Sequence, residues 1–118
     1  MNTHKVLVVA LEQIDELPVK LRDDAEVRVV APALNSRLRH WCSDDRAALQ
    51  RAATTLGSWL LALDRAGIRA SGRIGDANVV QAIEDEVARF AADEIVIPAE
   101  LEGRVRARFA PATLLVAA

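Results

Sequence analysis

The chain has 118 residues, which fits a single domain, residues 1–118, with one substantial core. Its net charge is −2, its 15 basic residues form no run interleaved with aromatics, and aromatic residues make up only 3%. These values argue against partners such as nucleic acid or an anionic membrane. The single cysteine, Cys42, cannot form an intramolecular disulfide, and the first apolar run is too short for a secretory signal or a membrane span. We therefore expect a cytoplasmic protein.

The first third of the chain predicts two buried strands, over residues 5–11 (KVLVVAL) and 26–31 (EVRVVA). Residues 12–23 between them predict a short helix that begins near Pro18 or is kinked there. The apolar positions behind this prediction recur at three- and four-residue spacing: Ile14, Leu17 and Leu21. A connection of about a dozen residues is near the minimum for a parallel crossover.

A polar loop over residues 33–42 precedes a long predicted helix, which Ser43 caps and Gly67 ends. The apolar seam expected on this helix is Leu49, Ala53, Leu56, Leu60 and Leu63, with Trp59 and Ala52 alongside. Leu61 falls on the polar side of the helix. Residues 68–74 (IRASGRI) alternate apolar and polar side chains and predict a third strand.

Residues 72–98 organise the rest of the chain, because their hydrophobic period changes from 2 to 3.6 and back, as in a βαβ unit. Asp76 is the expected helix cap. The apolar stripe of the helix is predicted to be Val79, Ile83, Val87 and Phe90, with Glu84, Asp85, Glu86 and Arg89 outside it. Residues 94–97 (EIVI) then predict a buried strand that stops at Pro98.

The chain ends in a short predicted helix over residues 100–109 and a last strand over residues 112–117 (ATLLVA). Strict alternation of strands and helices predicts an α/β fold with one five-stranded parallel sheet and helices on both faces. Such sheets usually take the Rossmann-like order 3-2-1-4-5 or the flavodoxin-like order 2-1-3-4-5. The core is expected to bury Val8, Leu56, Leu60, Ile83, Val87 and Val96.

Ligands of such sheets bind at the carboxyl ends of the strands, so the loops at residues 11–14, 32–43, 75–78 and 98–104 are the ones to inspect. None carries GxGxxG, a P-loop or the small-residue loop of a flavin site. A phosphoacceptor receiver domain would need clustered acids after the first strand, where only Glu12 is present.

His40, Cys42 and Asp44 lie close together, and imidazole and thiolate suit zinc, but two such ligands with no second pair elsewhere are a weak signal. A Cys–His nucleophile pair would need a third group to orient it, and the sequence indicates none. We therefore expect a loop that packs Trp41 onto the domain, with no metal site, no cofactor and no catalytic residue.

The stretch GDANVVQAIEDEVARFAADEIVIP resembles the G-D-P-x-x-x-I … A-D-x-I-V-x segment of universal stress proteins. The matching positions are Gly75, Asp76, Ile83, Ala92, Asp93, Ile95 and Val96. VLVVA and ATLLVA are similar to the first and last strands of that family, and VRVVAPALNSRLRHW resembles the second strand and loop of its small actinobacterial members, so the resemblance covers nearly the whole chain. It implies the strand order 3-2-1-4-5.

The chain departs from nucleotide-binding members of that family at two positions. They carry an Asp after the first strand, where this chain has Leu11-Glu12-Gln13, and a Gly-x-x-Gly-x9-Gly-Ser/Thr loop after the fourth. Here Ala99-Glu100-Leu101-Glu102-Gly103-Arg104 follows Pro98, with one glycine and two acids. Backbone N–H groups that approach a phosphate closely need glycine, so the resemblance does not extend to ATP binding.

Three hypotheses for function follow. The first is a universal stress protein-like domain that does not bind ATP and acts as a dimeric regulatory or adaptor protein. The second is a protein that binds a small ligand or nucleotide at the carboxyl ends of the strands, with the candidate residues Asn35, Arg37, His40, Asp76 and Arg104. The third, an enzyme with an unrecognised site, is the least favoured.

The last strand is apolar, contains neither Lys nor an internal Pro, and would lie at a sheet edge in the order 3-2-1-4-5. An edge of this kind is a template for pairing with another chain, and the resemblance implies dimerisation through it. We expect a homodimer with interface residues Thr113, Leu114, Leu115 and Val116. The alternative is a monomer in which Pro111 and the preceding helix blunt the edge.

Overall fold

The computed structural model describes residues 4–21, 24–34, 45–108 and 113–117. Its strands are β1 (Lys5–Val9), β2 (Glu26–Pro32), β3 (Arg69–Gly75), β4 (Glu94–Pro98) and β5 (Thr113–Ala117). Its helices are α2 (Asp45–Arg65), α3 (Val79–Phe90), the 3₁₀ turn η1 (Ala99–Leu101) and α4 (Glu102–Arg108). All neighbouring strands pair in parallel, in the order β3-β2-β1-β4-β5.

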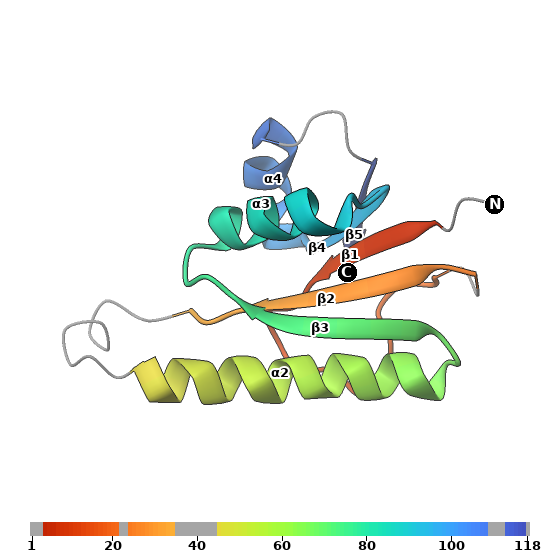
Figure 1. Cartoon of the computed structure of the whole chain (residues 1–118), viewed down its shortest axis with the longest axis horizontal. Coiled ribbons are helices and arrows are strands. Elements are labelled where there is room, and N and C mark those ends of the chain that lie inside the picture. The colour runs from red at the N-terminus through yellow and green to blue at the C-terminus, as the bar shows by residue number, and fades with distance from the viewer. Residues whose placement is uncertain (1–3, 22–23, 35–44, 109–112, 118) are drawn as a thin grey trace.

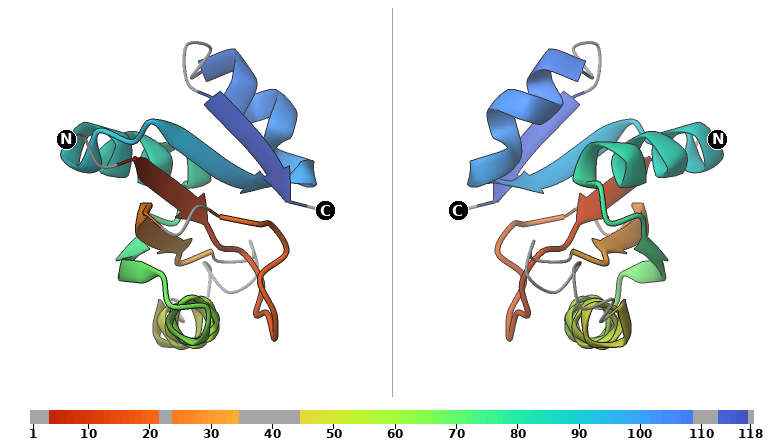
Figure 2. Two further views of the ribbon diagram at one scale, coloured as in Figure 1. Left: turned by 90° about the vertical axis from the view of Figure 1, so that its right-hand side faces the viewer. Right: turned by 90° about the vertical axis from the view of Figure 1, so that its left-hand side faces the viewer.

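The predicted α/β class with a parallel sheet is confirmed. The four strands whose side chains are described follow the order 3-2-1-4, and the backbone of β5 lies beside β4. Helix α2 covers one face of the sheet, while α3 and α4 lie over the other (Figure 1). Figure 2 shows the same layers from either end of the strands.

Two hydrophobic cores form because successive side chains of a strand point to opposite faces. On the α2 face, Val8 of β1 and Val29 of β2 pack with Trp59 and Leu63. On the α3 and α4 face, the core consists of Leu7, Val9, Val30, Val79, Ala82, Ile83, Ile95, Ile97, Leu101 and Val105. The central strands are therefore buried on both sides, which explains their continuous apolar runs.

The connection between β1 and β2 corrects one prediction, because the described residues from 10 to 25 form no helix. Ile14 and Leu17 do pack against the α2-face core, as their spacing suggested, but from an irregular chain. The backbone N–H of Ile14 donates to Ser58 Oγ (3.1 Å), and the indole N–H of Trp59 donates to the carbonyl of Glu12 (3.1 Å). These bonds to α2 replace part of the helical hydrogen bonding that Pro18 disfavours.

Helix α2 also differs from its prediction, because its buried seam is rotated toward smaller residues. The buried positions are Ala48, Ala52, Thr55, Trp59, Ala62 and Leu63. Leu49 is 47% exposed and Ala53 is exposed, whereas both were expected in the seam. Leu56 and Leu60 are half-buried and lie over Gly72 of β3. Leu61 is 49% exposed, as predicted.

Helix α3 is present as predicted, but its start and its buried face differ in detail. The cap is Asn78, whose Oδ1 accepts the N–H of Gln81 (3.1 Å). Asp76 instead accepts the N–H of Asn78 (2.8 Å) and so shapes the turn before the cap. Ile83 is buried, Val87 is half-buried, and the charged Glu86 is buried.

Two of the other predicted features are confirmed. Gly67 follows α2 with a φ of 73°, the left-handed conformation expected where a helix ends. Val8 and Val96 are buried, and they pair with each other in the register of β1 and β4.

None of the described helices is long and apolar enough to cross a membrane. No group of three or more potential metal ligands occurs among the described residues.

Candidate functional site at the carboxyl ends of the strands

The turn after β1 separates two hollows at the carboxyl ends of the strands. Leu11, Glu12 and Gln13 line both of them. β1 ends at Val9, and the next residue, Ala10, still donates its N–H to the carbonyl of Val30 (2.9 Å) before the chain leaves the sheet. One hollow opens toward β2 and α2, and the other toward β4.

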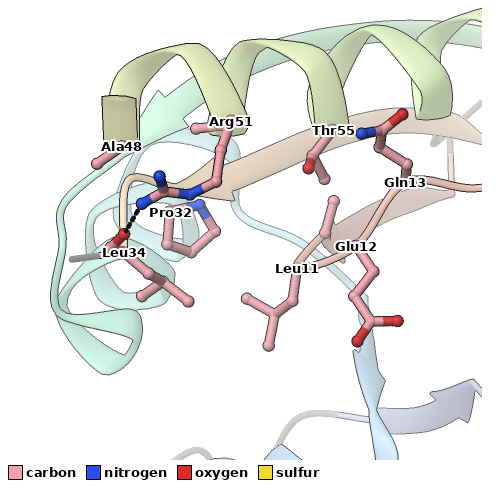
Figure 3. Close-up of a pocket in the computed structure, with 10 residues that line it drawn as sticks. Leu11, Glu12, Gln13, Pro32, Leu34, Ala48, Arg51 and Thr55 are labelled. Atoms are coloured by element: carbon pink, nitrogen blue, oxygen red, sulfur yellow. Dashed lines mark hydrogen bonds between the residues drawn. The ribbon is translucent and has the colours of Figure 1, made fainter. Parts of the chain in front are cut away.

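The first hollow, of about 320 Å³, lies between the ends of β1 and β2 and the first half of α2. Its polar side chains come from Arg51 and Thr55 of α2 and from the turn after β1 (Figure 3). Arg51 donates to the carbonyl of Leu34 (3.1 Å), which holds the chain after β2 against the helix. The carboxylate of Glu12 points away from Arg51 in Figure 3, so the two charges do not form a pair.

The second hollow, of about 270 Å³, lies between the ends of β1 and β4. This is the switch point of the sheet, where successive connections leave in opposite directions. Its apolar wall includes Ile14, Pro18, Trp59 and Pro98. Glu12 and Glu100, both exposed, are its only charged lining residues within the described part of the chain. The charge on the described lining of this hollow is therefore negative.

The chain passes from β4 into helix without an intervening loop. Pro98 has extended dihedrals (φ −63°, ψ 148°), η1 begins at the next residue, and α4 follows immediately. Leu101 is buried in the core at this junction, which anchors it. Glu102 accepts from Arg106 one turn later (2.7 Å). No glycine loop therefore separates β4 from the helix, and the first residues after Pro98 are Ala99, Glu100 and Leu101.

The structure does not bring the described candidate ligand residues together in these hollows. Asp76 lies in the turn after β3, and Arg104 is exposed on α4; neither lines either hollow. Asn35, Arg37 and His40 lie outside the described residues, as does Cys42. The candidate interface residues Thr113–Val116 belong to β5, whose backbone alone is described.

Sequence reasoning missed the contributions of Arg51, Thr55 and Trp59. Each comes from α2 and lines a hollow at the carboxyl ends of the strands, Arg51 and Thr55 the first hollow and Trp59 the second. The spacing of Thr55 could have indicated its position. It lies three residues after Ala52 and four residues before Trp59, so it shares the buried face of the helix with them.

The most unusual charged group that the sequence did not reveal is Glu86, on the opposite side of the sheet from α2. Its side chain is 1% exposed, and its carboxylate faces three arginines. Arg28 Nη1 lies 3.1 Å from Oε2, while Arg73 Nε and Arg89 Nη1 lie 3.2 and 3.5 Å from Oε1. This cluster ties α3 to β2 and β3, and its position away from the hollows indicates a bracing role.

Comparison with known proteins gives no relative: no protein-family model, no curated protein and no solved structure matches the chain.

Proposed function

We propose that the chain is a universal stress protein-like regulatory or adaptor domain that works as a homodimer, without enzymatic activity and without binding ATP. The observation that carries the proposal is the junction after β4, where Pro98 leads directly into η1 and α4. A triphosphate at the switch point would need a glycine loop there, whose backbone N–H groups it could approach closely. It would instead meet Glu12 and Glu100.

The test is calorimetric titration of the chain with MgATP at concentrations up to the millimolar range. We expect no saturable heat. The Glu12→Gln/Glu100→Gln double variant separates the two physical reasons, because it removes the acids and leaves the helical backbone unchanged. We expect no binding by this variant either, and micromolar affinity in the unmodified chain would overturn the proposal.

The dimeric part of the proposal rests on the position of β5 at the edge of the sheet, beside β4. Two β5 strands pairing antiparallel across a two-fold axis would bring Leu114 or Leu115 of the two copies together. Thr113→Pro removes a backbone donor from that edge and should lower the fraction of dimer in sedimentation. An unchanged dimer fraction would argue against this interface.

A second candidate function is the binding of a small ligand in the hollow between β1 and β4. The apolar wall, with two carboxylates at its rim, favours an apolar molecule that carries an amino group, and disfavours phosphates and carboxylates. Trp59 lines this hollow and can report on binding by fluorescence in a Trp41→Phe background. Alkylamines should change its emission more than the matching carboxylic acids. Glu12→Gln/Glu100→Gln should abolish that preference, and equal responses to the two series would contradict it.

A further inference from the structure

Thr55 of α2 carries a buried hydroxyl that the described part of the fold does not use. The residue is 7% exposed, and its carbonyl accepts from Ser58 Oγ, but its own hydroxyl has no hydrogen-bond partner among the described residues. The hydroxyl of its exposed neighbour Thr54, in contrast, donates to the carbonyl of Gln50 (2.9 Å). Buried polar groups nearly always have a partner. Thr55 lines the hollow between β1, β2 and α2, where a ligand could supply one (Figure 3).

Arg51 adds a positive charge to the same wall of this hollow, one helical turn before Thr55. Residues four apart lie one above the other on a helix, so the guanidinium and the hydroxyl share one side of α2. Arg51 donates one N–H to the carbonyl of Leu34 (3.1 Å) and forms no ion pair within the described residues. The carboxylate of Glu12 is directed away from it (Figure 3). The charge is therefore available to an anion in the hollow.

The rest of the lining is mainly apolar. The hollow has a volume of about 320 Å³, near the lower limit for sites that bind small molecules. Its remaining polar side chains, Glu12 and Gln13, belong to the turn after β1. The apolar lining residues are Ala10, Leu11, Pro32, Leu34, Ala48 and Ala52. A ligand of this hollow therefore needs a short apolar body and one anionic head group.

We propose that the hollow between β1, β2 and α2 binds a small monocarboxylate, with its head group on Arg51 and Thr55. A carboxylate accepts two parallel N–H groups from a guanidinium and has lone pairs left for a hydroxyl donor. A phosphate monoester carries nearly two charges, and the carboxylate of Glu12 in the lining would oppose the second one. This site is separate from the hollow between β1 and β4, and it depends neither on the dimer nor on the lack of ATP binding.

The test is calorimetric titration of the full chain with hexanoate, 1-hexanol and hexyl phosphate, each up to about 10 mM, a range that detects millimolar affinities. The three probes share a six-carbon chain and differ in the head group. We expect saturable binding of hexanoate at one site and weaker binding of the other two probes. Hexanol measures the contribution of the apolar wall alone.

Two substitutions then assign the site. Thr55→Val replaces the hydroxyl by a methyl group and should weaken hexanoate binding about tenfold. It should not lower the free energy of unfolding, because the hydroxyl has no partner to lose. Arg51→Gln should remove the preference for hexanoate over hexanol. The matched controls are Thr54→Val and Arg46→Gln, at exposed positions of the same helix outside the hollow, and both should bind hexanoate normally.

Absence of saturable heat with hexanoate would overturn the proposal, as would an affinity that Thr55→Val and Arg51→Gln leave unchanged. Tighter binding of hexyl phosphate than of hexanoate would also overturn the assignment to carboxylates. A Thr55→Val variant that loses stability together with binding would show that the hydroxyl has a structural partner and would refute its role as an anchor. Titration with MgATP is read separately, so a chain that binds both hexanoate and MgATP would refute the proposed function and leave this site intact.

Discussion

Arg28 of β2 and Glu86 of α3 are 58 residues apart in the chain, and their side chains meet at 3.1 Å over the sheet. Arg28 also donates to Ser71 Oγ of β3 (2.9 Å), and its guanidinium lies 5.2 Å from the centroid of the Phe90 ring. One arginine thus connects α3 with two neighbouring strands. A buried carboxylate without opposite charges beside it is costly. The stability of the folded chain around Glu86 therefore depends on these arginines staying in place.

We expect Glu86→Ala to lower the free energy of unfolding by about 1–3 kcal/mol, because it leaves three arginines without their shared acceptor. The arginines are a quarter to half exposed, so water offsets part of the loss. Urea denaturation of Glu86→Ala, Arg28→Ala and the double variant gives their coupling energy. Additive effects in this cycle would mean that the pair observed in the structure contributes nothing to stability.

The rotation of α2 predicts unequal costs for two of its leucines. Leu63 is fully buried, and Leu63→Ala should cost about 2–5 kcal/mol. Leu60 is only half-buried, so Leu60→Ala should cost about half as much. The seam predicted from the sequence placed Leu60 in the core and would imply the full loss of stability. Thermal or urea unfolding of the two variants is the measurement. Equal losses would place Leu60 in the core and would contradict the observed rotation.

Gly72 and Gly57 form a matched pair of substitutions to alanine. A Cβ at Gly72 would collide with Leu56 Cδ1, so Gly72→Ala should destabilise the chain by about 1–3 kcal/mol. A Cβ at Gly57 meets open space, so Gly57→Ala should raise helix stability by up to about 1 kcal/mol in dilute solution. Leu56→Ala should reduce the penalty at Gly72. Penalties at Gly72 that persist undiminished in that background would point to backbone strain instead.

The start of α3 provides a third comparison. Asn78 accepts the N–H of Gln81, so Asn78→Ala should cost about 1 kcal/mol. Asp76→Ala removes only the bond to the N–H of Asn78 in an exposed turn and should cost less. The measurement is urea denaturation of the two variants side by side. A larger loss at Asp76 would restore it as the functional cap.

How much of this fold the sequence predicts depends on whether a pattern is local. Valine-rich runs identify β1, β2 and β4 because a strand buried on both faces needs continuous apolar residues. Periodicity also finds α2 and α3. It does not fix their rotation, because a seam of leucines and a seam of alanines with one tryptophan fit a helix equally well. The choice depends on what the sheet offers, and here Gly72 of β3 leaves room for Leu56 and Leu60 at the side of α2.

The candidate site is less predictable for the same reason. The expectation that ligands meet the carboxyl ends of the strands identified the turn after β1, and Glu12 does line both hollows. Arg51 and Trp59 belong to a helix that begins more than 30 residues later, and only tertiary packing aims them at that turn. Glu86 could not be found by periodicity, because a charged residue beside an apolar stripe is assigned to the exposed side of the helix until its three partners are known.

The irregular connection between β1 and β2 has a consequence for amide hydrogen exchange. Amides of β1 and β2 are locked in a central ladder, whereas those of residues 15–20 belong to no helix or strand and should exchange through local opening of the native state. Ile14 and Pro18 in this connection also line the hollow beside β4. A molecule that fills the hollow should therefore slow exchange along the connection while leaving the ladder unchanged, so deuterium uptake can locate a ligand before its chemistry is known.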